Sequence, residues 1–429
     1  MHAVAEVERV DHRSSRFDLH TDEASDFFLE AFAPEFRANP YPLYERMRRR
    51  GSVLATDVEM HLAFGHAACW SVLRNPAGSS DERRGTAAQR DSDSGVVPTA
   101  LLQQRQSLIF MDPPDHTRIR ATVASCFTPR RIASLRHDID TNTARLINDL
   151  RHTSGAGPVD LVESFAYPLP LTIICGMLGV PLSDYELFHG WSRTMTKGID
   201  PGVLRSEADN VEIANAWVEI GAYIVGLLAD LARTPGDNLL SDLVQQHGKT
   251  GGITDGELVD LVILLLVAGH ETTVNLIGNG MLALCDNPEQ LRMWAHDPSV
   301  AETGVDELLR YDSPLQMVQR IATTDIDVDG AHVAAGDHVI VVLGAANRDP
   351  LVFDNPDRLD VRRANAARHV SFGGGIHHCL GATLARVEGA IAITQLLRAF
   401  PNIERVGDAP LRDTFTLRGR ESIAVLLNI

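Results

Sequence analysis

Residues 371–381 read S-F-G-G-G-I-H-H-C-L-G, and this glycine-rich segment constrains the chain more than any other feature. Its glycines allow a tight loop with left-handed backbone angles and the close approach of a flat cofactor. Helical periodicity follows over 381–400, so Cys379 stands where a loop meets a helix. Backbone N–H groups and the helix N-terminus there lower the pKa of a cysteine and favour its thiolate. We therefore expect Cys379 to be an axial ligand of iron.

Other interpretations of the same residues fail on spacing. A phosphate-binding loop would need G-K-[ST] after its glycines, and this segment has none. A zinc site would need a second pair of ligands beside His378 and Cys379. The five cysteines are scattered and contain no C-x-x-C, which argues against a disulfide scaffold and an iron–sulfur cluster.

A long apolar helix is predicted from Thr254 to about residue 285, a length on the order of 45 Å. Its run A-G-H-E-T-T at 268–273 sets small residues beside an acid, Glu271, and an alcohol, Thr272. Because a threonine hydroxyl can bond back to the helix backbone, we expect the helix to open there into a groove. Position 274 is valine, which excludes a zinc-protease motif. The apolar run 261–269 is well short of the ~20 residues that cross a membrane.

Three shorter patterns complete the set: E-x-x-R at Glu307 and Arg310, P-D-x-L at 356–359, and D-P-P-x-H-T-x-x-R at 112–120. Together with the cysteine loop and A-G-H-E-T-T, they resemble the motifs of the cytochrome P-450 superfamily, the haem-thiolate monooxygenases. The loop fills every fixed position of that family's F-G-x-G-x-H-x-C-x-G. The resemblance runs from about residue 39 to the C-terminus.

The resemblance implies a mainly α fold with a small β region, a triangular helical single domain of the cytochrome P-450 type. It would occupy residues 39–429, after an N-terminal extension at 1–38. The implied cofactor is haem b, with the Cys379 thiolate as axial ligand and O2 as co-substrate. The implied haem contacts are His116, Arg120, Arg320, His377, Phe372, Gly373, Ala268 and Gly381.

The resemblance also assigns roles to the remaining motif residues. Thr272 would stabilise the iron-bound hydroperoxide, and Glu271 would relay protons. Glu307 and Arg310 would pair on one helix face and brace the cysteine loop. An arginine from the later P-D-x-L segment would complete that network. We assign this role to Arg358, with Arg363 as the alternative.

The substrate is expected to be a hydrophobic small molecule of macrolide, polyketide, terpenoid, steroid or fatty-acyl type, bound in a mostly apolar pocket. Two polar stretches, 78–105 and 184–211, are expected to control access to it. By resemblance the pocket would be lined by Leu264, Val267, Ala268, Gln316, Met317, Val318, Phe415 and Leu417.

The net charge and composition of the chain indicate which partners it can bind. The chain carries 39 basic and 57 acidic residues, a formal net charge of −18, which argues against a nucleic-acid partner. Its charged opening lacks the apolar stretch of a signal peptide, so we expect a cytoplasmic protein without a membrane anchor. No flavin or nicotinamide fingerprint is present, so electrons from NAD(P)H would arrive through a ferredoxin and its reductase. We expect a locally basic surface near Cys379, formed by Arg118, Arg120 and Arg386.

Two alternative functions remain open at this point. The first is a peroxide-driven peroxygenase, which typically lacks the acid–alcohol pair, so Glu271 and Thr272 argue against it. The second is a haem-binding sensor or carrier without turnover, in which the loss of Thr272 would have no effect. The favoured function is a monooxygenase that inserts one oxygen atom of O2 into its substrate.

Overall fold

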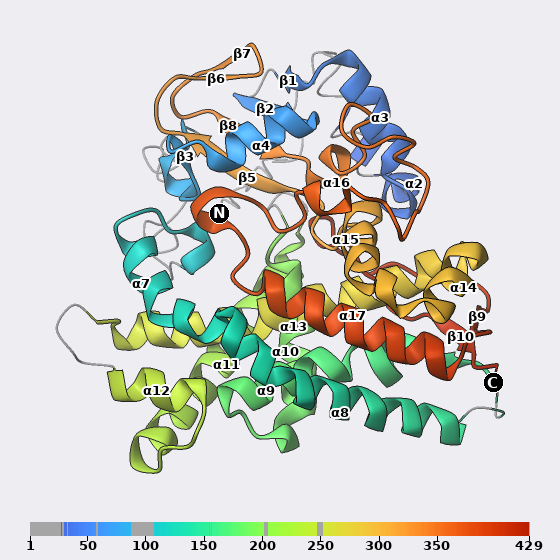
Figure 1. The fold of residues 1–429 in the computed structure, drawn as a ribbon. Helices are drawn as coiled ribbons and strands as arrows, with labels where there is room; N and C mark the ends of the chain where they lie inside the picture. The colour runs from blue at the N-terminus through green and yellow to red at the C-terminus, as the bar shows by residue number, and fades with distance from the viewer. Residues whose placement is uncertain are drawn as a thin grey trace, which may run out of the picture.

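A computed structural model describes residues 27–428, apart from 28–29, 32, 57–58, 87–106, 154, 156, 201–204 and 247–251. The described chain is mainly helical and has small sheets (Figure 1), which confirms the expected fold class. Its α-helices are α2 Pro34–Ala38, α3 Tyr41–Arg50, α4 His66–Arg74, α7 Asp115–Ala124, α8 Pro129–Thr153, α9 Pro168–Leu178, α10 Tyr185–Lys197, α11 Glu207–Arg233, α12 Leu239–Gln246, α13 Asp255–Cys285, α14 Pro288–His296, α15 Ala301–Tyr311, α16 Leu343–Ala346 and α17 Ala382–Ala399.

Helix α13 organises the core. Thr254 and Glu257 form a capping box at its start: each side chain accepts the backbone N–H of the other residue. From there α13 runs through the middle of the molecule and packs against α9, α11, α15 and α17 (Figure 1). It is an uninterrupted α-helix, so the expected opening of its backbone at residues 268–273 is not present.

Three small sheets complete the fold. The five-stranded sheet has the order β1-β2-β8-β5-β3, in which β2 and β8 are parallel and the other pairs antiparallel. Residues 321–342 supply β8, part of β5, and the separate antiparallel β6–β7 pair. The strands are β1 Val53–Ala55, β2 Met60–Ala63, β3 Gly78–Ser79, β4 Val159–Asp160, β5 Val318–Ala322, β6 Ile326–Val328, β7 Ala331–Val333, β8 His338–Val341, β9 Glu404–Arg405 and β10 Ala424–Leu426.

The packed structure begins before residue 39. Phe27 and Phe36 are buried, and their rings pack against Tyr44, with centroids 6.4 and 5.6 Å from the tyrosine ring. The predicted boundary between an extension and the domain therefore does not coincide with an edge of the core. Residues 1–26 of the predicted extension lie outside the described residues.

Several local predictions differ from the structure. Helices α4 and α10 are not among the predicted elements, and residues 162–178 form a π-helical turn, Val162–Ala166, followed by α9. The division falls just before Pro168, which has no N–H to continue the hydrogen-bond ladder. Most of the expected access loop, residues 87–105, lies outside the described residues.

Among the described residues, two helices, α11 and α13, are long and apolar enough to cross a membrane by length and composition alone. For α13 this reflects its place in the core, because 78% of its most apolar window is buried. In α11, 28% of the most apolar window is buried.

Candidate active site

The cysteine loop folds as its glycines predict. Gly373 and Gly375 have φ values of 66° and 64°. A Cβ on Gly375 would lie 2.4 Å from the carbonyl oxygen of Leu73, because α4 packs directly against the loop. The backbone N–H of Cys379 donates to the carbonyl oxygen of Phe372 over 2.9 Å. Sterics and hydrogen bonding thus fix Cys379 just before α17.

Cys379 is exposed, whereas the other four cysteines are buried or half-buried. The surrounding protein nevertheless raises the pKa of its thiol by desolvation, against the opposing effect of the Gly381 and Ala382 N–H groups and of Arg120 and Arg386. The lowered pKa expected from the sequence is therefore wrong for the polypeptide alone, because desolvation outweighs the helix N-terminus. A coordinated metal ion deprotonates a thiol, so iron binding would overcome this cost.

Predicted propionate ligands come together beside the loop. The rings of His116 and His377 have centroids 4.4 Å apart. Both ring nitrogens of His116 and Nε2 of His377 are buried without a hydrogen-bond partner among the described residues. Burial lowers the pKa of His377 to about 3, assisted by the nearby cations Arg320 and Arg120. Buried polar groups without partners are costly, and an anionic ligand would satisfy them.

The other predicted cofactor contacts lie around Cys379. Arg120 donates to the carbonyl oxygen of His378 over 2.7 Å, and burial lowers the pKa of Arg320 to about 10. Phe372 is half-buried, with the guanidinium of Arg386 4.5 Å from its ring centroid. At Gly381 a Cβ would meet no atom within 4 Å, so nothing in the polypeptide requires glycine there.

One narrow face of α13 remains accessible. Between residues 258 and 284 every residue is buried except Leu264, Ala268, Gly269 and Thr272. Leu264, Ala268 and Thr272 are four residues apart and therefore share one helix face. The Thr272 hydroxyl donates to the carbonyl oxygen of Ala268 over 3.1 Å, as expected for a threonine within a helix.

Glu271 points elsewhere. It is 1% exposed, Oε1 accepts the hydroxyl of Ser192 (2.5 Å), and Oε2 accepts Nη1 of Arg412 (2.5 Å). Burial alone would raise the pKa of Glu271, but His270, Arg412 and Ser192 together hold it well below the usual range. The side chains of Glu271 and Thr272 therefore point in different directions, because consecutive helical residues are about 100° apart.

The predicted substrate contacts divide into two groups. Leu264 and Ala268 lie on the accessible face of α13, and Val318 of β5 is half-buried. The prediction that Gln316 contacts the substrate is wrong. Its side chain is buried, donates to the Ser313 carbonyl (2.7 Å) and accepts from the Tyr44 hydroxyl (3.1 Å), so its polar atoms already have hydrogen-bond partners. The predicted contacts Val267, Met317 and Leu417 are also buried, with 9%, 6% and 5% exposure.

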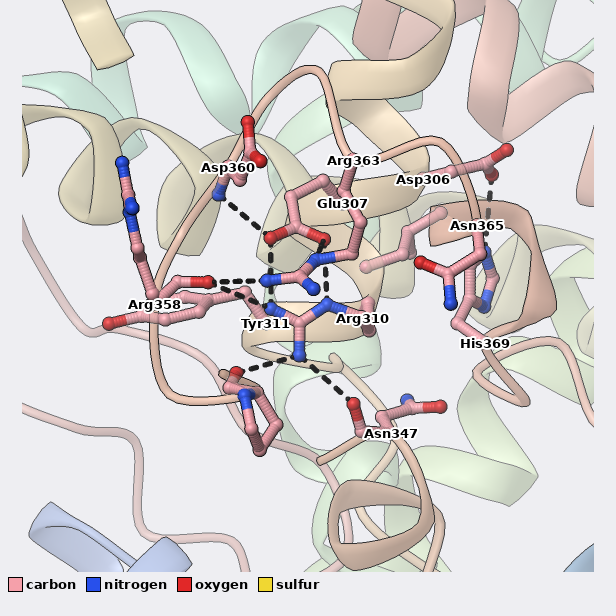
Figure 2. A network of polar contacts seen from close by, with 12 residues as sticks. Asp306, Glu307, Arg310, Tyr311, Asn347, Arg358, Asp360, Arg363, Asn365 and His369 are labelled. Atoms are coloured by element: carbon pink, nitrogen blue, oxygen red, sulfur yellow. Dashed lines mark hydrogen bonds and ion pairs between the residues drawn. The ribbon is translucent and has the colours of Figure 1, made fainter. Parts of the chain in front are cut away.

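A buried charge network is formed by side chains of α15 and of the segment 347–363 (Figure 2). Glu307 and Arg310 are both 0% exposed and form a bidentate pair, with distances of 2.6 Å from Nε to Oε2 and 2.9 Å from Nη2 to Oε1. The third charge comes from Arg363, whose Nε donates to Oε2 of Glu307 over 3.0 Å. The prediction that the Arg358 side chain completes the network is therefore wrong. Arg358 is exposed and contributes its carbonyl oxygen, which accepts from Arg363 (2.9 Å) and Arg310 (3.3 Å).

This network reaches the loop through Asn347. Arg310 donates to the Asn347 carbonyl over 3.0 Å. The Asn347 amide in turn accepts from the N–H of Val370 (2.7 Å) and donates to the hydroxyl of Ser371 (2.8 Å). Val370 and Ser371 immediately precede Phe372, so the position of the cysteine loop depends on the charge network.

Comparisons with known proteins match these features over nearly the whole chain. The chain is 36% identical over 381 residues to the cytochrome P-450 monooxygenase PikC of Streptomyces venezuelae, covering 87% of each protein. The chain belongs to the cytochrome P-450 family. A family profile described as cytochrome P-450 matches residues 300–417. The protein is therefore similar in class to oxidoreductases of the haem-thiolate monooxygenase type, as predicted.

Two further matches agree. A vitamin D(3) 25-hydroxylase of Pseudonocardia autotrophica is 37% identical over 385 residues, covering 87% of this chain and 89% of that protein. The ligand-free crystal structure of CYP164A2 from Mycobacterium smegmatis superimposes with a TM-score of 0.85 at 36% identity, covering 94% of this chain and 99% of that one. These matches confirm the predicted cytochrome P-450 fold.

The residues present fit a haem. The exposed thiol of Cys379 would bind the iron, and N–H groups of the unpartnered His116 and His377 rings would donate to the haem carboxylates. When bound, the haem supplies the activation of O2 that no amino-acid side chain provides. The protein's own part is to hold the thiol, the propionate donors and the accessible face of α13 in fixed places.

Sequence reasoning missed the partners of Glu271. Arg412 and Ser192 belong to none of the family motifs in the sequence, and they lie 141 and 79 residues from Glu271 along the chain. His270 occupies the variable position of A-G-H-E-T-T. Only its place inside the longest apolar helix could have signalled that its imidazole must find buried partners.

Proposed function

We propose that the protein is a monooxygenase that takes electrons from a ferredoxin and inserts one oxygen atom of O2 into a hydrophobic small molecule. The observation that carries this proposal is the face formed by Leu264, Ala268 and Thr272. In a helix that is otherwise buried, this face offers an apolar wall and one hydroxyl. Such a wall suits an apolar substrate held beside the oxygen-activating centre. Thr272 is the hydroxyl that can donate to an oxygen species there.

The substrate class is supported by the names of relatives. One relative is a vitamin D(3) 25-hydroxylase, and another is the polyketide biosynthesis cytochrome PksS of Bacillus subtilis, 39% identical over 326 residues. Both names imply large, mostly apolar compounds. The partly accessible contacts Leu264, Ala268 and Val318 are apolar as well, so we infer a substrate of steroid or polyketide type.

The surface beside the cysteine loop supports a protein electron donor. Trp70 and Ile376 are 40% and 51% exposed, and the Arg74 guanidinium lies 5.3 Å from the Trp70 ring centroid. Exposed aromatic and arginine side chains are typical anchors of protein interfaces. We infer that an acidic ferredoxin docks on this surface, and that the enzyme works in the cytoplasm.

The positive charge of this surface differs from the expected set. Arg118 is bound to Glu257 (2.6 Å) and Asp115 (2.9 Å), and Arg386 is bound to Asp306 (2.7 Å). Arg120 donates to a backbone carbonyl instead of a carboxylate. Uncompensated charge for a ferredoxin therefore comes from Arg74 and Arg120.

The first test is the carbon monoxide difference spectrum of the dithionite-reduced holoprotein, with Cys379→His as the control. We expect the red-shifted Soret band of a thiolate-ligated ferrous haem in the wild type and its loss in the variant. Wild-type protein without that band would contradict the proposal.

A second test separates the monooxygenase from a peroxygenase and from a carrier. The holoprotein is given NADPH, ferredoxin, ferredoxin reductase and O2, or hydrogen peroxide alone, with a panel of steroids and macrolides. Product from the NADPH system supports the proposal. Product from peroxide alone would indicate a peroxygenase, and binding without product from either oxidant would indicate a carrier.

A further inference from the structure

The outer face of α11 carries an apolar stripe that is open to solvent. Val211, Val218 and Val225 are 56%, 70% and 57% exposed, although valine is among the residues most often buried in proteins. Ala222 and Ala229 are exposed as well. The helix is apolar enough to cross a membrane, yet only 28% of its most apolar window is buried. A contiguous apolar surface of this kind marks an interaction site.

The stripe has the period of a seam between two helices. Its three valines are seven residues apart, and Ala222 and Ala229 each follow a valine by four residues. A seven-residue apolar repeat keeps the same side of a helix against a partner helix along its length. The 27 residues of α11 span about 40 Å, so the stripe can contact a second helix over several turns.

Helix α10 adds to this surface. The indole N–H of Trp191 donates to Glu219 of α11 over 2.9 Å, and the Tyr223 hydroxyl of α11 donates to Asp184, just before α10, over 2.6 Å. Leu187 lies between these two contacts, one turn before Trp191 on the same side of α10. Its side chain is 50% exposed. A further exposed apolar side chain therefore lies beside the valine stripe.

The charges at the ends of α11 favour a second copy of the same helix in the opposite direction. Its first turn contains Glu207 and Asp209, and its last turn contains Arg233. Antiparallel copies bring the basic end of each helix to the acidic end of the other, whereas parallel copies bring like charges together. Arg233 is free to turn toward a new carboxylate, because its pair with Asp230 is exposed on both sides, at 73% and 67%, and such pairs contribute little.

A lipid surface fits this face less well. Helices that lie on anionic membranes carry lysine and arginine around their apolar side. Helix α11 contains five acidic residues and one basic residue. Glu212 and Glu219 are exposed next to the valines, where they would be repelled by acidic headgroups.

We propose that two copies of this protein associate through α11, with the helices antiparallel and the valine stripe at the centre of the interface. A two-fold axis at Val218 places Val218 against itself and Val211 against Val225 of the second copy. Glu207 of each copy then lies within about one helical turn of Arg233 of the other. The same patch is used on both copies, as two-fold symmetry requires.

The test measures the molar mass of the full-length holoprotein by sedimentation equilibrium over a series of protein concentrations. We expect the wild type to rise from one chain of 46.9 kDa toward two chains. Val218→Glu should weaken association roughly tenfold or more, because it buries a charge at the centre of the interface. Val218→Leu should still associate. Leu351→Glu is the matched control, because Leu351 is 92% exposed and lies outside the stripe.

Cysteine variants test the direction of the two helices. Val218→Cys should form a disulfide-linked pair on mild oxidation, because the residue meets its own copy at the axis. Val211→Cys alone should not form one, but a mixture of Val211→Cys and Val225→Cys should. Thermal unfolding and the haem spectrum of each variant should match the wild type, because these valines lie on the surface.

Several results would overturn this inference. One is a wild-type protein that stays at 46.9 kDa at every concentration, and another is association that persists unchanged in Val218→Glu. A cross-link in Val211→Cys alone would rule out the antiparallel arrangement. A monomer that binds vesicles of phosphatidylserine, and loses this binding in Val218→Glu, would show that a membrane is the occupant instead. None of these measurements depends on turnover, so they stand apart from the tests of the monooxygenase.

Discussion

Glu271 and Thr272 are consecutive residues of α13, yet their side chains are held by different parts of the molecule. Thr272 bonds back to Ala268 on the accessible face, while Glu271 is clamped by Arg412 and Ser192 in the interior. The acid therefore depends on α10 and on the C-terminal segment, and the alcohol depends on α13 alone. Substitutions at the two positions should have separable effects.

The hydroxyl of Thr272 should matter for coupling rather than for stability. In Thr272→Ala we expect hydrogen peroxide released per NADPH to rise and product per O2 to fall about tenfold, which corresponds to roughly 1.4 kcal/mol. Thr272→Ser keeps the hydroxyl and should behave like the wild type. Equal product per O2 in all three proteins would contradict the role of Thr272.

Loss of Arg412 should destabilise the protein. Arg412→Met leaves the Glu271 carboxylate buried without its cation, and removing one partner of a buried ion pair costs about 3–5 kcal/mol. Urea unfolding at pH 7 measures the change in the free energy of unfolding. Arg405→Met is the control, because Arg405 and Asp286 form an exposed pair at 3.0 Å, for which we expect less than ~1 kcal/mol.

The same variant should change how stability depends on pH. In the wild type the pKa of Glu271 lies below its usual value, so the pair stabilises the fold above the unfolded pKa of about 4.3, and this contribution is lost as the pH falls below it. Without Arg412, only His270 and Ser192 oppose burial, so the pKa of Glu271 should rise from its lowered value. The difference in stability between wild type and variant should therefore shrink as the pH falls from 7 to 3, below the unfolded pKa. A difference between wild type and variant that is equal at both pH values would contradict this account.

Arg363 and Arg358 offer a matched pair of substitutions. Arg363→Ala removes a guanidinium that is 8% exposed and donates to Glu307, so we expect a loss of several kcal/mol and a lower haem content. Arg358→Ala removes an exposed side chain but keeps the carbonyl that the network uses, so we expect a change within about 0.5 kcal/mol. Thermal unfolding of the two variants decides the assignment, and equal losses would contradict it.

Glu388 of α17 is a buried acid whose pKa is shifted in the opposite direction from that of Glu271. It is 1% exposed, Oε2 has no hydrogen-bond partner among the described residues, and burial raises the pKa of the carboxyl well above its usual value. The folded state therefore keeps a proton that the unfolded chain loses, so stability should fall by up to about 1.4 kcal/mol per pH unit above the unfolded pKa. Glu388→Gln should remove this slope in urea unfolding at pH 5, 6 and 8. A slope unchanged by the substitution would show that Glu388 is ionised in the fold.

Motifs formed by neighbouring residues could be predicted from the sequence. The cysteine loop needed only its glycines and the helix that follows, and the pairing of Glu307 with Arg310 needed only their spacing of three on one helix. The length of α13 and its cap at Thr254 were equally readable. In each case the interaction lies within one or two helical turns, where backbone geometry alone sets which side chains meet.

The sequence determined the family, the glycine-rich loop that carries Cys379 and the helix that carries Thr272, because these depend on local patterns. Tertiary structure alone decided that Arg363 and not Arg358 reaches Glu307 and that the Gln316 side chain is buried between Ser313 and Tyr44. It also decided that Glu271 meets Ser192 and Arg412, which lie 79 and 141 residues away along the chain. Which cation satisfies a buried carboxylate depends on which segments the packed core brings together, and the spacing of residues does not encode that.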